Sequence, residues 1–127
     1  MGVMEGTRGL KEWRGEYSFA VDAGAQGTIT LRSNDGSIPA GSIVFGGYLE
    51  ITTSCLSATG TMALQVEAAE DILATSLQAA LVAGRYDVKP DCTGTATVKT
   101  TVARDPKLVI ATADFTAGIF SLVLFYN

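Results

Sequence analysis

The side chains that could do chemistry in this chain are two cysteines and a few carboxylates, because the sequence contains no histidine. Cys55 and Cys92 stand 37 positions apart, without the close Cys and His pairs that zinc sites use. A disulfide between them is allowed by the sequence but is not indicated by it. We expect two reduced thiols, with Cys55 packed as a small hydrophobic residue inside a strand.

Two short clusters of oxygen-bearing side chains offer the remaining chemistry. Asn34 and Asp35 could each give an oxygen to calcium, but they lie in a run of turn-forming residues, 33–37. Two neighbouring ligands fall well short of a calcium loop. Glu70 and Asp71 could act as paired carboxylates, but adjacent acids at the start of a segment are more simply a cap or a solvated face.

Catalysis is therefore not expected. Acid–base and nucleophilic catalysis need a poised group with an orienting partner, and the commonest general base, histidine, is absent. Neither GxxxxGK nor GxGxxG occurs, so the sequence has no loop that would cradle phosphate groups. We expect no enzyme activity, no cofactor and no metal.

Composition limits the fold and the partners. A chain of 127 residues with 47% hydrophobic content is long enough for one substantial core and too short for two ordinary domains. A net charge of −4 argues against nucleic acid, which requires clustered Lys and Arg. No apolar run approaches the ~20 residues that cross a bilayer. The segment 1–5 lacks the pattern of a signal peptide, so we expect a soluble protein without a cleaved leader and without a membrane partner.

The clearest strand signal is the run 42–53, SIVFGGYLEITT, which alternates with a period of two. The alternation predicts that Ile43, Phe45, Leu49 and Ile51 face a core, and that Tyr48, Glu50 and Thr52 face outward. A corner at 37–41, with a proline and a glycine, precedes this strand.

Similar patterns predict further strands at 16–22, 28–32, 61–67, 85–89, 95–102, 107–112 and 118–126. In the first of these, Tyr17, Phe19 and Val21 are expected to face inward, and the first two strands could form a hairpin. The segment 70–84 stays open. Leucines at helical spacing favour a helix there, whereas the surrounding strands favour a short strand at 72–75 followed by a loop.

The closing run 118–126 is apolar on both parities, so neither of its faces can be left to water. We expect a central strand, covered on one side by the core and on the other by a partner or by the N-terminal segment. Phe120, Leu122, Leu124 and Tyr126 cannot share one core with Ile119, Val123 and Phe125, so one of the two sets needs another partner.

The first fifteen residues show no sustained period and are predicted to form an extended N-terminal arm, 1–15, outside a domain at 16–127. Leu10 and Trp13 could anchor this arm in an apolar groove, with Arg8 and Arg14 at the rim. These four residues are our predicted contacts with a binding partner or with another subunit. The alternative is a frayed terminus.

About eight short strands joined by Gly, Pro, Asn and Asp turns predict an all-β fold, a two-sheet β-sandwich of jelly-roll type. The order of four segments adds a resemblance: YSFAVDAGAQGT, IPAG leading into IVFGGYLEITT, GTMALQVEAAEDI, and TAGIFSLVLFY. Together they resemble a family of small virion proteins of tailed bacteriophages, over most of the chain from Tyr17 to Tyr126.

The resemblance implies a capsid decoration or cement protein of jelly-roll type, bound non-covalently to the major capsid protein on the outside of a phage shell. It also implies synthesis in the host bacterial cytoplasm and assembly as a homotrimer. The predicted trimer interface lies on the closing strand and comprises Phe120, Leu122, Leu124, Phe125 and Tyr126. The alternative is a carbohydrate- or receptor-binding module of a head fibre or tail, for which the candidate aromatic residues are Trp13, Tyr48 and Tyr86.

Overall fold

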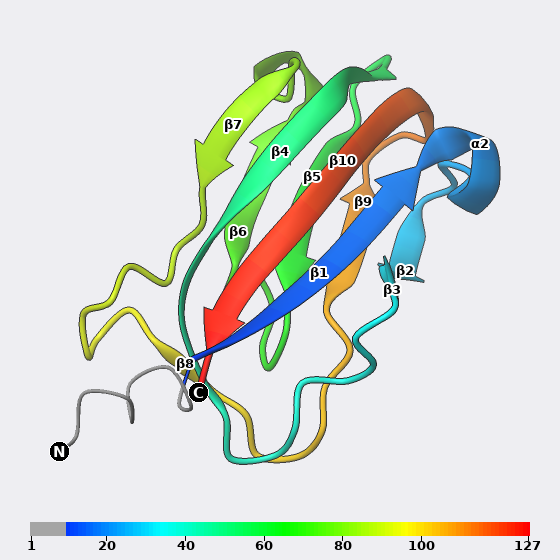
Figure 1. Ribbon diagram of the computed structural model, residues 1–127. Coiled ribbons are helices and arrows are strands. Elements are labelled where there is room, and N and C mark those ends of the chain that lie inside the picture. Colours follow the sequence, from blue (N-terminus) through cyan, green and yellow to red (C-terminus); the bar gives the residue numbers. More distant parts are fainter. Residues whose placement is uncertain (1–9) are drawn as a thin grey trace, which may run out of the picture.

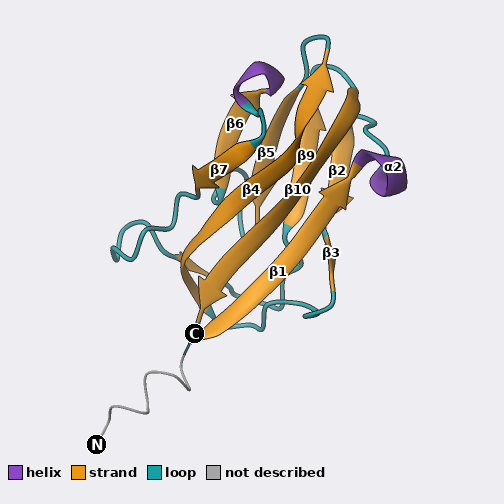
Figure 2. Ribbon diagram, turned by 45° about the horizontal axis from the view of Figure 1, so that its top comes forward, coloured by secondary structure: helices purple, strands orange, loops and turns teal. Residues whose placement is uncertain are grey.

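The computed structural model describes residues 10–127 as two antiparallel β-sheets packed face to face (Figures 1 and 2). The larger sheet contains β1 (Lys11–Ser18), β3 (Arg32–Ser33), β4 (Ile43–Ser57), β7 (Gly84–Asp87), β8 (Val98–Lys99) and β10 (Phe115–Tyr126). The smaller sheet contains β2 (Gly27–Thr30), β5 (Thr61–Gln65), β6 (Leu73–Leu77) and β9 (Lys107–Ala111). The helical elements are one turn of α-helix, α2 (Phe19–Asp22), and one turn of 3-10 helix, η1 (Gln78–Ala80).

The strand order is that of a jelly roll. Apart from the two-residue strands β3 and β8, the larger sheet runs β1-β10-β4-β7 and the smaller one runs β2-β9-β5-β6. Except for β5 and β6, which pair with each other, successive long strands lie in opposite sheets, and the last strand returns to lie between the first strand and β4, as two Greek keys require. The predicted sandwich of about eight strands is confirmed, and the structure supplies the order that the sequence did not.

The core fills the space between the sheets. Alternate side chains of β4 and β10 point inward, and the ring of Tyr17 from β1 stacks on Phe120 from β10, with centroids 5.3 Å apart. The members of the core cluster on the long strands are Trp13, Tyr17, Val44, Leu49, Ile51, Cys55, Met62, Leu64, Leu108, Ile110, Phe115, Phe120, Leu122, Leu124 and Tyr126. The inward parity predicted for Leu49 and Ile51 is confirmed.

A β-bulge in β4 corrects the predicted parity at its start. Tyr126 pairs with Val44 and Phe125 pairs with Gly46, so Phe45 is the extra residue on its strand. One extra residue reverses the alternation. Val44 is therefore fully buried, whereas Ile43, which we predicted to face the core, is exposed.

The N-terminal boundary of the domain was also predicted wrongly. The predicted arm 1–15 ends in a strand, because β1 pairs with β10 along its whole length, from Lys11 with Tyr126 to Ser18 with Ile119. The sandwich therefore begins at Lys11 and not at residue 16. The chain leaves the strand early at the other end, where α2 carries Phe19 and Val21 into solvent instead of into the core.

Three other segments differ from the prediction or decide between its alternatives. The segment 70–84 forms β6 followed by η1, so the strand-and-loop alternative is correct, because pairing of β6 with β5 overrides the helical spacing of its leucines. In the segment 95–102, only β8 forms a ladder with β4. The possible hairpin of the first two strands does not form among the described residues, since β2 pairs with β9 in the opposite sheet. Of β2 and the short β3 that follows it, only β3 pairs with β1, Glu16 with Arg32 and Gly15 with Ser33.

Candidate functional site

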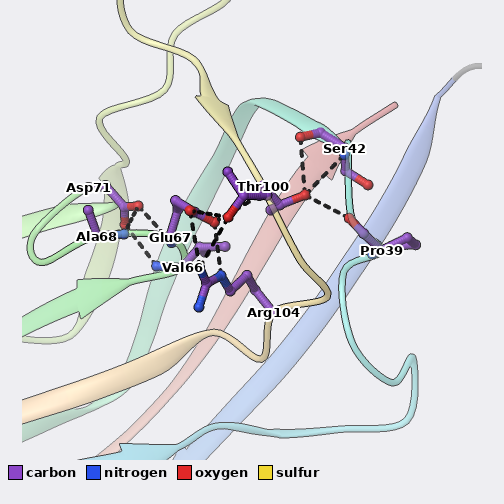
Figure 3. A network of polar contacts seen from close by, with 9 residues as sticks. Pro39, Ser42, Val66, Glu67, Ala68, Asp71, Thr100 and Arg104 are labelled. Atoms are coloured by element: carbon purple, nitrogen blue, oxygen red, sulfur yellow. Dashed lines mark hydrogen bonds and ion pairs between the residues drawn. The ribbon is translucent and has the colours of Figure 1, made fainter.

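The carboxylates that could do chemistry belong to a structural network at one end of the sandwich (Figure 3). Arg104 donates from Nε to Oε1 of Glu67 at 2.8 Å and from Nη2 to Oε2 at 3.1 Å. Thr101 donates to the same two oxygens, from its backbone N–H at 3.1 Å and its hydroxyl at 2.8 Å. The hydrogen bonds from Arg104, then those from Thr101, lower the pKa of Glu67 to about 2. A carboxylate that stays ionised because both oxygens accept hydrogen bonds joins two segments of the fold, and it is not available as a general base.

The acidic pair that we weighed for catalysis holds backbone instead. The carboxylate of Asp71 accepts the backbone N–H groups of residues 66–68, each at 2.8 Å (Figure 3). Glu70 accepts the N–H of Thr75, in the middle of β6, at 2.7 Å. Both carboxylates therefore hold the backbone in place, Asp71 in a turn and Glu70 along β6.

Thr100 ties the corner before β4 to the same end of the molecule. It is almost fully buried, donates its hydroxyl to the carbonyl of Pro39 at 2.7 Å, and accepts the N–H of Ser42 at 3.0 Å. Within residues 10–127, every buried side-chain nitrogen and oxygen has a partner, and no three His, Cys, Asp or Glu side chains converge as they would around a metal.

The turn at 33–37 is a turn in the structure as well. Asp35 accepts the backbone N–H of Arg14 at 2.8 Å, and Ser33 donates its hydroxyl to the carbonyl of Arg14 at 2.6 Å. The carboxylate oxygen that we considered for calcium thus fixes the turn against β1.

The two cysteines lie in different surroundings and both are free. Cys55 is buried in β4, and burial raises the pKa of its thiol to about 11. Cys92 is exposed in the loop after β7. Neither α2 nor η1, the helical elements among residues 10–127, is long and apolar enough to cross a membrane.

The residues predicted to contact a capsid or another subunit do not lie together in the structure. Trp13 is 1% exposed in the core, and its Nε1 donates to the carbonyl of Gly36 at 2.8 Å, so it cannot be the anchor of a free arm. Leu10 is exposed, and the side chain of Arg14 is exposed on the outer side of β1. Arg8 lies outside the described residues.

The residues of the predicted trimer interface also point to different sides of the larger sheet. Four of its five members point into the domain's own core and are nearly or fully buried there: Phe120, Leu122, Leu124 and Tyr126. These four cannot form a subunit contact while the sandwich is folded, because strand alternation turns them away from the surface. Phe125 points to the outer face of the larger sheet and is half-buried.

The outer face of the larger sheet carries a small aromatic patch around Phe125. Its ring lies 6.4 Å from the ring of Tyr48, which is 36% exposed. A hollow of about 430 Å³ is lined by Leu10, Lys11, Glu12, Phe45 and Phe125. We call these residues with Tyr48 the outer patch. The third aromatic candidate for ligand binding, Tyr86, donates its hydroxyl to the carbonyl of Val82 at 2.6 Å.

The comparisons with known proteins identify the fold. The chain superimposes on a chain of the acid-stable capsid of Helicobacter pylori bacteriophage KHP30 with a TM-score of 0.62 and 14% identity, over 92% of this chain and 86% of that one. A chain of the cyanophage Pam1 capsid asymmetric unit gives a TM-score of 0.61 and 21% identity, over 92% and 83% of the two chains. This chain has the fold of phage capsid components. No protein-family model matches it, and no curated protein matches it in sequence.

One exposed apolar surface was not predicted from the sequence. Four large apolar side chains are exposed at the end of the sandwich opposite the polar network: Leu56, Leu77, Val82 and Ile119. The signal was present as two long stretches without any charged residue, 51–66 and 72–84. Strand alternation could not reveal most of it, because Leu56 and Leu77 lie near strand ends and Val82 lies in a loop. Ile119 lies within β10, on the parity opposite to its core-facing residues.

Proposed function

We propose that this protein is a capsid decoration or cement protein, which binds the outside of a phage shell and stabilises it through non-covalent contacts. The observation that carries the proposal is the match of 92% of the chain, in one jelly-roll order, to chains of two phage capsids. The resemblance of the sequence segments to small virion proteins of tailed phages supports the same role.

The role is structural and not catalytic. The carboxylates best placed for chemistry, Glu67 and Asp71, are fully occupied as hydrogen-bond acceptors within the fold. A shell can be stabilised by buried area alone, because many identical weak contacts act together on a symmetric particle.

The shell contact is assigned to the outer patch. Leu10, Phe125 and Tyr48 offer apolar area, while the neighbouring Glu12 and Arg14 are exposed and give the polar rim that reversible contacts show. Two of the predicted contact residues, Leu10 and Arg14, therefore keep their proposed role, in a rigid sheet face instead of a free arm.

The protein is proposed to act as a homotrimer on the shell. A trimer presents three copies of the outer patch at once, so that a weak contact becomes a strong one through effective concentration. The major capsid protein is the proposed partner.

The alternative function is a carbohydrate- or receptor-binding module of the virion. Tyr48 is the one observation in its favour, since its ring is exposed on a flat sheet face beside Phe125. Glycan-array binding that is lost on Tyr48→Ala, together with no binding to shells, would favour this alternative.

Co-sedimentation with empty shells of the phage that encodes the chain tests the proposal. The purified protein should pellet with the shells and raise their melting temperature, and Phe125→Asp should weaken binding at least tenfold. The control is Thr28→Asp, an exposed position on β2 in the opposite sheet, which should bind as the unchanged protein does. A protein that stays in the supernatant at micromolar concentration would contradict the proposed function.

A further inference from the structure

The two ends of the sandwich differ sharply in charge. We call residues 52–61, 75–84 and 111–119 the apical end. They form the β4–β5 turn, η1 with its flanks, and the β9–β10 turn, at the top of Figure 1. These three segments contain a single charged residue, Asp114, and the adjoining helical turn α2 at the same end adds Asp22, which is ion-paired with Arg32. The loops at the other end, 34–42, 66–72 and 88–106, hold many charged residues, including Glu67, Lys89 and Arg104.

The apical end also exposes large apolar side chains. The exposed fraction is 53% for Leu56, 61% for Leu77, 51% for Val82 and 43% for Ile119. Monomeric soluble proteins seldom expose apolar residues together, and where they do the patch usually marks a contact.

Hydrogen bonds and strand pairing place these residues beside one another. The N–H of Cys55 donates to the carbonyl of Leu81 at 3.0 Å, which brings the segment with Val82 against β4 next to Leu56. Thr61, at the start of β5, pairs with Leu77. Ile119 pairs with Thr53, one strand away in the same sheet. The four side chains therefore belong to adjoining segments at one end of the sandwich.

We infer that the apical end is the surface through which copies of this chain pack on one another. The inference rests on the homo-oligomer of the proposed function and assigns its interface. An interface that is covered permanently, as between identical subunits, is more apolar than the rest of the surface, whereas a contact made and broken in solution has ordinary surface composition.

The charge pattern favours a second copy over a different partner. Two ends with so few charged residues can meet while burying few unpaired charges, and burying an unpaired charge is costly. A chain with a net charge of −4 repels its own copies least where it carries the fewest charges. The outer patch, with Glu12 and Arg14 at its rim, has the mixed composition of the reversible contact and is left for the shell.

The mass of the full-length protein in solution tests the inference, by multi-angle light scattering at about 10 µM. Val82→Asp should reduce the mass from that of an oligomer to 13.2 kDa, the mass of one chain. The matched control is Val102→Asp, since this valine is also 51% exposed but lies at the charged end. The control should keep the mass of the unchanged protein.

A second variant guards against a folding defect. Leu77→Asp, at a side chain that is 61% exposed, should dissociate the oligomer while the circular dichroism spectrum stays unchanged. An unchanged protein that is already monomeric, or apical variants that keep the oligomer mass, would overturn the inference. Dissociation by Phe125→Asp alone would move the interface to the outer patch and overturn it as well. If the protein without substitutions is a monomer and still binds shells, the inference is wrong but the proposed capsid role is not contradicted.

Discussion

The guanidinium of Arg104 grips both carboxylate oxygens of Glu67, with Nε 2.8 Å from Oε1 and Nη2 3.1 Å from Oε2. The pair joins the segment after β5 to the segment before β9. It lies beyond the last paired residues of these two strands, Gln65 and Lys107. A bidentate pair of this kind fixes orientation as well as distance. The charged loops thus have a defined geometry at the end of the sandwich where the chain also enters and leaves the fold (Figure 1).

This pair predicts how the stability of the protein depends on pH. Hydrogen bonds from Arg104 and Thr101 lower the pKa of Glu67 from 4.5 to about 2 in the folded state. The stabilisation is therefore complete above pH 4.5 and is lost as the pH falls from 4.5 through 2. The melting temperature of Glu67→Gln should lie below that of the unchanged protein at pH 7, and the two should converge near pH 2. The exposed Asp87, which joins no ion pair within residues 10–127, provides the control Asp87→Asn, whose difference from the unchanged protein should not follow this course.

Trp13→Ala should destabilise the fold by about 3–5 kcal/mol, the range for removing a large aromatic residue from a core. The side chain is 1% exposed and gives up a hydrogen bond to Gly36 as well. Urea denaturation measures the loss. The matched substitution Leu10→Ala, three residues earlier at an exposed position, should change the unfolding free energy by less than about 0.5 kcal/mol. A fully stable Trp13→Ala would return Trp13 to the role of a surface anchor.

The two cysteine thiols should differ clearly in their reactivity toward a thiol reagent. Cys92 is exposed, whereas Cys55 is buried and the pKa of its thiol is raised to about 11. Because the thiolate is the reactive species, a thiol reagent at pH 8 should label one cysteine of the native protein and both cysteines in denaturant. Cys92→Ser should abolish native labelling. Two fast-reacting thiols in the native protein would contradict the packing of β4.

Much of the fold could be predicted from alternation, because a strand with one buried face repeats every two residues. Leu49, Ile51 and Tyr17 were placed correctly on this basis. The same rule failed where the backbone breaks the period. The bulge at Phe45 reversed the parity before it, and the helical turn α2 removed Phe19 from its strand. Local spacing contains no information about either event.

The error at the N-terminus has a different physical cause. Trp13, Gly15 and Tyr17 share one parity and all three are buried, so the period of β1 was present in the sequence. Glycine hid it, since Gly15 contributes no apolar side chain to the pattern. Its role is to leave room: a Cβ at Gly15 would lie 2.1 Å from an atom of the Trp13 indole. The contact residues were harder still to predict, because exposure is decided by the partner strands and not by the residue itself.

The neighbouring glycines of β4 give a prediction in which each residue is the control for the other. Gly47 has a φ of +150°, and a Cβ there would lie 2.2 Å from the carbonyl oxygen of Val123 and 3.1 Å from Cα of Leu124. Both are backbone atoms of β10, the central strand, which cannot move aside without breaking its ladder. Gly47→Ala should therefore cost about 2–4 kcal/mol, from backbone strain and overpacking together.

At Gly46 a Cβ would meet nothing closer than the Phe125 ring at 3.7 Å, an ordinary contact, and the backbone has no unusual φ. Gly46→Ala should therefore change the unfolding free energy by less than about 1 kcal/mol. Thermal and urea unfolding of the two variants side by side measures the difference. Equal stability of the two would mean that β4 and β10 do not approach each other in this register, and that the pairing of Tyr48 with Val123 is wrong.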